Sequence, residues 1–126
     1  MKNPVSFAVL GYGHIGKRHA ATIHAHPGAE LRSVADVVDV SASLEGDSEG
    51  EKISVYPSIE DLLAHSPLPE VISVCTPNGF HAAQCIQILE AGCHVVLEKP
   101  IALSVSDARL VAETSRATGK HVFCVM

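Results

Sequence analysis

The stretch VSFAVLGYGHIG at residues 5–16 decides the fold expected for this chain. Its first half is an apolar run typical of a buried strand, and Gly11, Gly13 and Gly16 follow with the spacing G-x-G-x-x-G. A backbone that approaches a pyrophosphate needs one glycine for a tight turn, one for close approach and one for packing a helix on the strand. The three glycines can fill these roles in that order. The stretch therefore predicts a strand, a phosphate-binding turn and a helix.

Three further residues join this candidate dinucleotide site. The helix is expected to start near Ile15, beside His14, and to direct its free N–H groups and positive dipole end at the phosphates. Asp36 stands twenty residues after Gly16, the offset at which a carboxylate accepts hydrogen bonds from the adenosine ribose. The alternative is an ordinary strand-to-helix turn, followed by an aspartate that only ends a strand.

Asp36 also favours NAD over NADP. The 2'-phosphate of NADP is an anion, and two unit charges ~4 Å apart repel by about 4 kcal/mol at an effective dielectric constant of ~20. The next residues are Val37 and Val38, so no neighbouring cation offsets this repulsion. We therefore expect NAD as the cofactor, unless a basic residue arrives from a distant loop.

Length and composition narrow the class of protein. A chain of 126 residues with 47% hydrophobic residues is large enough for one domain with a real core. The net charge of -5, with nine scattered basic residues, argues against nucleic acid as a partner. No apolar run approaches the roughly 18 residues that a membrane span needs. We expect a cytoplasmic protein that does not bind membranes.

The cysteines and histidines do not indicate a metal or a disulfide. Cys75, Cys85, Cys93 and Cys124 form no C-x-x-C pair, and three of them lie in apolar runs typical of buried free thiols. His14 and His19 are five residues apart, whereas ligands on one helical face would be three or four apart. The histidines are expected to pack or to face solvent.

Strand-like and helix-like segments alternate along the chain. The runs that predict strands are Val5–Leu10, Leu31–Asp36, Ile53–Val55, Val71–Cys75, Val95–Glu98 and His121–Val125. They are short, rich in valine and isoleucine, and largely lack the alternation of a half-exposed sheet, so both faces should be buried. This order predicts an α/β Rossmann fold, a doubly wound parallel sheet of about six strands with helices on both faces.

Helix signals fill the intervals. An apolar stripe at Ala82, Cys85, Ile86 and Leu89 runs to Gly92, and another at Ala108, Val111, Ala112 and Ser115 runs to Gly119. Ser58 with Asp61, and Ser104 with Asp107, resemble capping boxes. The acidic stretch Glu45–Glu51 is expected to be a loop after a single turn at Ser41–Leu44.

Two further polar segments follow predicted strands. Cys75-Thr76-Pro77-Asn78 ends one strand and Glu98-Lys99-Pro100 ends the next. Ligands of an open parallel sheet bind beyond the carboxyl ends of its strands. Both segments are therefore expected at the same edge as the glycine turn.

Together these motifs make the chain resemble the cofactor domain of the glucose-fructose oxidoreductase, inositol dehydrogenase and MocA family (Gfo/Idh/MocA). The likeness covers essentially the whole chain. It rests most specifically on Gly11 to Gly16 with Arg18-His19, on Thr76-Pro77-Asn78 followed by His81, and on Glu98-Lys99-Pro100.

The resemblance implies roles for the second group of residues. Cys75, Thr76, Pro77 and Asn78 would line the cleft near the nicotinamide and its ribose, with His81 supporting that wall. Lys99 would reach the junction of nicotinamide and substrate as the catalytic residue. An ammonium there can orient a sugar hydroxyl and stabilise the alkoxide that develops as hydride leaves carbon. Glu98 would hold Lys99 or the ribose in position, and Pro100 would fix the chain after it.

The family pattern also includes a second α/β domain that covers the cleft and supplies acid and base groups. Residues 1–126 would then be the dinucleotide-binding domain alone, with the substrate domain outside this chain. The resemblance implies a sugar, cyclitol or nucleotide sugar as substrate and a homo-oligomer as the assembly. Two alternatives stay open: a free-standing NAD(H)-binding redox sensor, and a methyltransferase, which would leave Lys99 unexplained.

Overall fold

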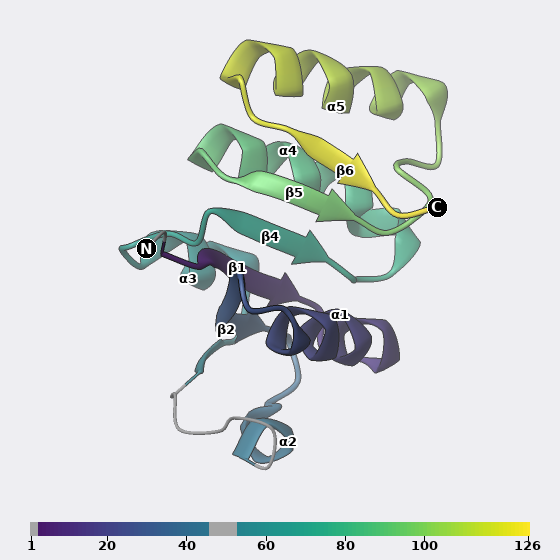
Figure 1. The fold of residues 1–126 in the computed structure, drawn as a ribbon. Helices are drawn as coiled ribbons and strands as arrows, with labels where there is room; N and C mark the ends of the chain where they lie inside the picture. Colours follow the sequence, from purple (N-terminus) through teal and green to yellow (C-terminus); the bar gives the residue numbers. More distant parts are fainter. Residues whose placement is uncertain (1–2, 46–52) are drawn as a thin grey trace.

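The computed structural model describes residues 3–45 and 53–126, and Figure 1 shows a single sheet with helices packed on it. The strands are β1 (Val5–Leu10), β2 (Ala29–Ala35), β3 (Ser54–Tyr56), β4 (Val71–Val74), β5 (His94–Leu97) and β6 (Val122–Cys124). The helices are α1 (His14–Ala25), α2 (Ser41–Glu45), α3 (Ile59–Ala64), α4 (His81–Ala91) and α5 (Val105–Thr118), with a 3-10 turn η1 at Asn78–Phe80.

The sheet is parallel throughout, in the order β3-β2-β1-β4-β5-β6. The order runs outward from β1 in one direction and then from β4 in the other. A crevice forms at such a switch point, beyond the carboxyl ends of β1 and β4. The predicted Rossmann fold of about six parallel strands is confirmed.

Two hydrophobic cores lie on opposite faces of the sheet. Alternate residues of β1 divide between them, because successive strand side chains point to opposite faces. Leu10 packs with the residues of α3, α4 and α5 in one core, and Val9 packs with those of α1 and α2 in the other. The prediction of helices on both faces is therefore confirmed.

The α1 side of the outer strands differs from the prediction that every strand is buried on both faces. Val96 of β5 lines a groove beside α1 and is only half-buried, and Phe123 of β6 is 58% exposed. The three connections that lead to β4, β5 and β6 run through α3, α4 and α5, all on the opposite face. A uniform apolar run in the sequence cannot show this difference, because it depends on which side each crossover takes.

Several strands begin or end one or two residues away from their predicted boundaries. β2 begins at Ala29 rather than Leu31, because Ala29 and Glu30 pair with Val5 and Ser6 in the parallel ladder. Backbone pairing therefore extends the strand beyond its apolar run. At the other end, Asp36 lies just past β2, as Cys75 and Glu98 lie just past their strands.

The predicted helix ends are confirmed by their capping geometry. The hydroxyls of Ser58 and Ser104 each accept a hydrogen bond at 3.1 Å from the backbone N–H three residues on. Gly92 and Gly119 close α4 and α5 in the left-handed conformation, with φ of +98° and +71°. Of the predicted apolar stripes, Cys85, Leu89 and Val111 are buried, and the remaining five residues are only partly buried or exposed.

The region after β2 is described only in part. The single turn predicted at Ser41–Leu44 is the short helix α2, which ends at Glu45. The loop predicted at Glu45–Glu51 lies outside the described residues apart from Glu45. Among the described helices, none combines the length and apolarity needed to cross a bilayer.

Candidate functional site

The glycine turn fits against its neighbours too closely for side chains at two positions. Gly11 has φ of +87°, and a Cβ there would stand 2.9 Å from the carbonyl carbon of Cys75. A Cβ on Gly16 would lie 1.9 Å from the Gly11 carbonyl oxygen. The first and third glycines therefore let β1, β4 and α1 approach one another, as the motif requires.

Gly13, in contrast, borders open space. A Cβ built there meets no heavy atom within 4 Å, and Gly13 is the N-cap residue of α1. No side chain in the described part of the chain caps this helix end, and its first turn holds no acidic residue. The N–H groups and positive dipole end of α1 thus face a space that an anion can enter.

Asp36 is fixed beside this turn by two backbone N–H groups. One carboxylate oxygen accepts a hydrogen bond at 2.7 Å from the N–H of Tyr12, the residue between the first two glycines. The other accepts one at 2.9 Å from the N–H of Val38. Each oxygen keeps a second lone pair for a ligand hydroxyl. The next two residues, Val37 and Val38, are 90% and 64% exposed. The surface beside Asp36 is therefore formed there by uncharged side chains.

The segment after β4 forms a second wall next to the glycine turn. Cys75 donates its N–H to Leu10 at 2.8 Å, which holds the end of β4 against the end of β1. The Thr76 hydroxyl donates to Gln84 of α4, while Pro77 and Asn78 are exposed. Burial, with a smaller contribution from the charge of Glu98, raises the pKa of the Cys75 thiol to about 12. Cys75 therefore remains a neutral packing residue at physiological pH.

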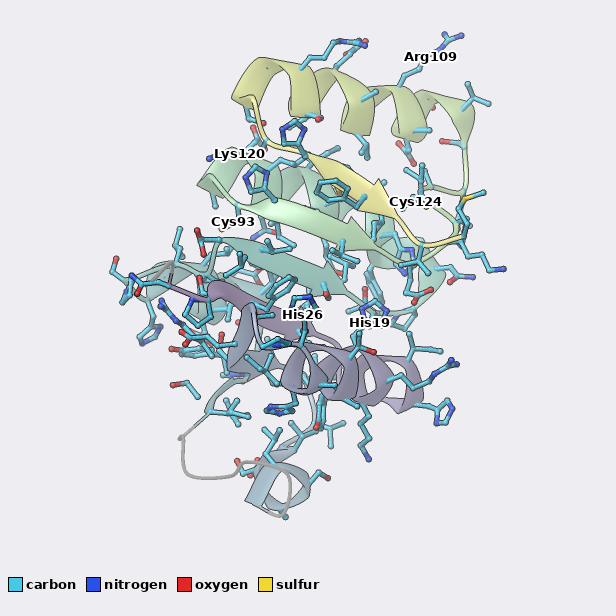
Figure 2. The ribbon with its side chains drawn as sticks, in the orientation of Figure 1. His19, His26, Cys93, Arg109, Lys120 and Cys124 are labelled. Atoms are coloured by element: carbon cyan, nitrogen blue, oxygen red, sulfur yellow. The ribbon has the colours of Figure 1, made fainter. Side chains whose placement is uncertain are left out.

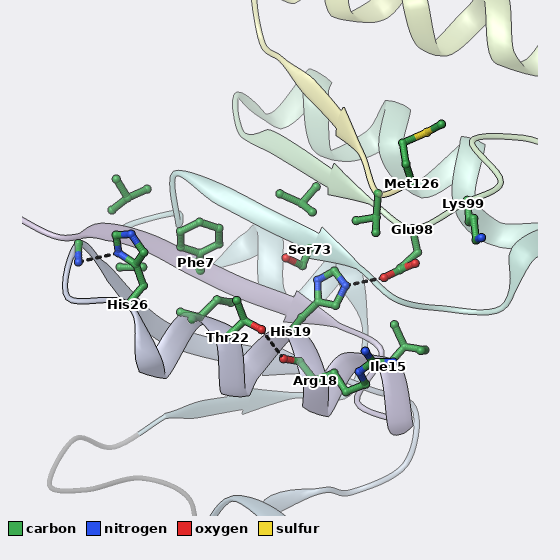
Figure 3. Close-up of a pocket in the computed structure, with 16 residues that line it drawn as sticks. Phe7, Ile15, Arg18, His19, Thr22, His26, Ser73, Glu98, Lys99 and Met126 are labelled. Carbon is green, nitrogen blue, oxygen red and sulfur yellow. Dashed lines mark hydrogen bonds and ion pairs between the residues drawn. The ribbon is translucent and has the colours of Figure 1, made fainter.

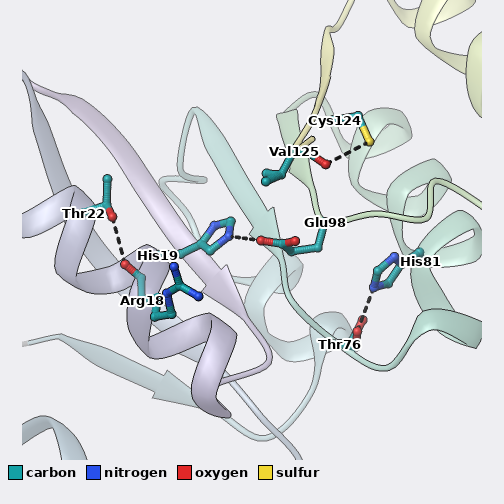
Figure 4. Close-up of polar contacts among 8 residues, drawn as sticks. All are labelled: Arg18, His19, Thr22, Thr76, His81, Glu98, Cys124 and Val125. Atoms are coloured by element: carbon teal, nitrogen blue, oxygen red, sulfur yellow. Dashed lines mark hydrogen bonds and ion pairs between the residues drawn. The ribbon is translucent and has the colours of Figure 1, made fainter.

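His81 lies behind this wall and is 1% exposed. Its Nε2 stands 2.7 Å from the carbonyl oxygen of Thr76 (Figure 4), and its Nδ1 stands 2.8 Å from that of Pro100. One buried ring thus connects the two polar segments that were predicted from the sequence. The histidine was predicted as a support for the wall, but the link to Pro100 has no signal in the sequence.

Glu98 points toward α1 rather than toward Lys99. Its carboxylate accepts a hydrogen bond at 2.6 Å from Nε2 of His19, and the two side chains are only 20% and 16% exposed (Figures 3 and 4). This hydrogen bond was not predicted, since its partners are 79 positions apart and local spacing cannot relate them. It holds α1 to the end of β5. Lys99, the next residue, is exposed at the same edge.

A groove of about 780 Å³ runs along the α1 side of the sheet. Figure 3 shows that it passes between α1 and the strands β1, β4 and β5. Ile15, Glu98 and Lys99 line one end, and Val5 and Gly28 line the other. The groove therefore leads from the amino ends of the strands to the edge that carries the predicted site.

The remaining histidines and cysteines do not gather into a site. In Figure 2, His19 and His26 lie at separate points along and just beyond α1, and Cys93 and Cys124 lie on separate segments. All four cysteines are free. Within residues 3–45 and 53–126, no three histidine, cysteine or acidic side chains converge to hold a metal ion.

The predicted residues thus collect at one edge of the sheet, around the switch between β1 and β4. The glycine turn, the carboxylate at the end of β2 and the open helix N-terminus define a dinucleotide-binding α/β domain. Residues 5–125 also match the family model described as the oxidoreductase family, NAD-binding Rossmann fold (Gfo/Idh/MocA). The chain belongs to this oxidoreductase family and forms its NAD-binding domain.

Two curated proteins with similar sequences are dehydrogenases. The chain is 35% identical to D-glucoside 3-dehydrogenase of Escherichia coli (strain K12), over 94% of this chain and 33% of that protein. It is 32% identical to scyllo-inositol 2-dehydrogenase (NAD(+)) of Bacillus subtilis (strain 168), over 94% of this chain and 34% of that protein.

A solved structure gives the same result. The WlbA dehydrogenase of Chromobacterium violaceum, in complex with NADH and UDP-GlcNAcA, superposes with a TM-score of 0.86 at 31% identity. The match covers 98% of this chain and 35% of that one. The chain spans about a third of the length of the curated relatives named above.

Proposed function

We propose that the whole protein is a dehydrogenase that moves hydride between NAD and a hydroxyl-bearing carbon of a sugar, cyclitol or nucleotide sugar. The observation that carries this proposal is the position of Lys99. Its exposed side chain follows β5 at the same sheet edge as the glycine turn. The substrate class is supported by the similar proteins, which are named as a glucoside dehydrogenase, an inositol dehydrogenase and a dehydrogenase solved with UDP-GlcNAcA.

The cofactor would lie across this edge. The N–H groups near Gly13, His14 and Ile15 would receive the pyrophosphate, and Asp36 would accept hydrogen bonds from the adenosine ribose. The exposed Pro77 and Asn78 would border the nicotinamide half, with Cys75 and Thr76 packed beneath them. Support comes from the open space at Gly13 and the lone pairs left on Asp36.

Lys99 would act on the substrate hydroxyl. NAD, when bound, supplies the carbon that accepts the hydride. As the C–H bond breaks, the hydroxyl proton would leave to a base of the proposed second domain, and the oxygen would carry negative charge in the transition state. An ammonium hydrogen-bonded to that oxygen stabilises this charge and orients the hydroxyl. Glu98, paired with His19, would hold the backbone in place directly before Lys99.

Replacement of Lys99 tests this role in the whole protein. Lys99→Met keeps most of the side-chain length and removes the charge, so kcat should fall about a hundredfold, the usual cost of losing one such donor. The dissociation constant for NAD should change by less than about threefold. Both are measured by steady-state kinetics and calorimetry, with Lys99→Arg as the control that keeps a cation. Unchanged kcat in Lys99→Met would contradict the catalytic role of Lys99, and a wild-type protein that binds NAD without turnover would favour the redox-sensor alternative.

Three coarser features of the whole protein are also proposed. A second domain that binds the substrate is supported by the length of the relatives, about three times the matched span. A homo-oligomer is supported by the resemblance to the family alone. A cytoplasmic location is supported by the free thiols of all four cysteines, because oxidising compartments favour disulfides.

A further inference from the structure

His81 connects the segments that follow β4 and β5, beyond the point where the hydrogen bonds of the sheet join them. The β4–β5 ladder ends at Val74 and Leu97, and the N–H of Glu98 still reaches the carbonyl of Val74 at 3.3 Å. Past that point the chain turns toward Thr76 on one side and Pro100 on the other. The His81 ring lies between these two carbonyl oxygens, at 2.7 and 2.8 Å.

As hydrogen bonds, both contacts require a donor on the His81 ring. Carbonyl oxygens only accept hydrogen bonds, so the ring nitrogen is the donor wherever one of these contacts is a hydrogen bond. A ring that carries one proton can donate to one oxygen, and a ring that carries two can donate to both. The ring is 1% exposed, so water does not take the place of either partner. The buried ring therefore has no direct access to a ligand.

The two carbonyls belong to residues at the proposed site. Thr76 precedes the exposed Pro77 and Asn78, and Pro100 follows Lys99 directly. A shift of the Pro100 carbonyl would move the backbone of Lys99 with it. A shift of the Thr76 carbonyl would move the nicotinamide side of the wall.

We propose that His81 is a positioning residue that fixes the distance between the Thr76-Pro77-Asn78 wall and Lys99. The proposal rests on the proposed function, because it assigns these two segments to the nicotinamide half of the cofactor. It predicts that a change at His81 weakens binding of the nicotinamide half of the cofactor and leaves binding of the adenosine half unchanged.

The test compares NADH with ADP-ribose, which has the adenosine half and lacks the nicotinamide. Calorimetry gives both dissociation constants for the wild-type chain and for His81→Gln, whose amide reaches one carbonyl at most. NADH affinity should fall about tenfold in the variant, because an amide that reaches one segment replaces a ring that contacts both, while ADP-ribose affinity stays within about twofold. Gln87→Ala is the matched control, because it removes a polar side chain of α4 that bonds to Glu60, away from the site.

Each outcome decides the proposal. Equal NADH affinity in wild type and His81→Gln overturns it, and so does an equal loss for both ligands, which indicates general support of the fold. Failure of the wild-type chain to bind either ligand contradicts the cofactor site itself and not the role of His81.

If His81→Gln does not fold, nuclear magnetic resonance of the wild-type chain tests the same link. A His81 ring proton protected from exchange, with NADH bound, supports the link, and a freely exchanging ring contradicts it.

Discussion

Gly16→Ala is expected to lower the free energy of unfolding by at least about 3 kcal/mol, which for a domain of this size lowers the thermal midpoint by about 10 °C or more. The added Cβ would stand 1.9 Å from the Gly11 carbonyl oxygen. Both atoms belong to backbone-anchored positions, so neither can rotate away and α1 must move off β1. Such a loss is a large fraction of the stability of an ordinary domain.

Gly79→Ala is the matched control for this substitution. Gly79 has no atom within 4 Å of a built Cβ and no positive φ. Its midpoint should stay within about 2 °C of wild type, as is usual for surface substitutions. Thermal unfolding followed by circular dichroism measures both variants. A Gly16→Ala midpoint equal to that of Gly79→Ala would show that α1 does not pack on the turn as described.

Gly13→Asp is expected to separate folding from cofactor binding. Asp is a favoured N-cap residue, and its charge suits the positive end of α1, so stability should rise by about 0.5 kcal/mol. The same carboxylate would enter the space reserved for the pyrophosphate. Repulsion of about 4 kcal/mol at ~4 Å corresponds to roughly a thousandfold weaker binding of NAD.

Gly13→Asn provides the control, because it offers a similar cap and similar volume without the charge. It should bind NAD more weakly than wild type, through size alone, and more tightly than Gly13→Asp. Calorimetric titration with NAD and thermal unfolding are measured on the same samples. Retention of NAD affinity in Gly13→Asp would place the phosphates elsewhere.

The sequence predicted the parts of the site that depend on short spacings. The role of Gly16 follows from the approach of the turn to its own helix, which six residues determine, whereas Gly11 also makes room for Cys75 at the distant end of β4. Asp36 could be placed because the crossover through α1 returns the chain beside β1 after a nearly fixed length. The capping residues Ser58 and Ser104 were also local, since each bonds three residues ahead.

Contacts between distant segments could not be predicted in the same way. The His19–Glu98 pair and the His81–Pro100 link depend on how α1 and α4 lie relative to the end of β5, which no local pattern encodes. The exposure of Phe123 has a similar cause. Its strand is as apolar as the others, and only the side chosen by the crossover helices leaves one face uncovered within the described part of the chain.

The central claim is that the glycine turn and Asp36 together form a site for NAD. Calorimetric titration of the wild-type chain with NAD and with NADP tests it most directly. Asp36 should make NAD bind at least about tenfold more tightly, because the 2'-phosphate would approach a carboxylate that two N–H groups hold in place. Equal or tighter binding of NADP would contradict the account.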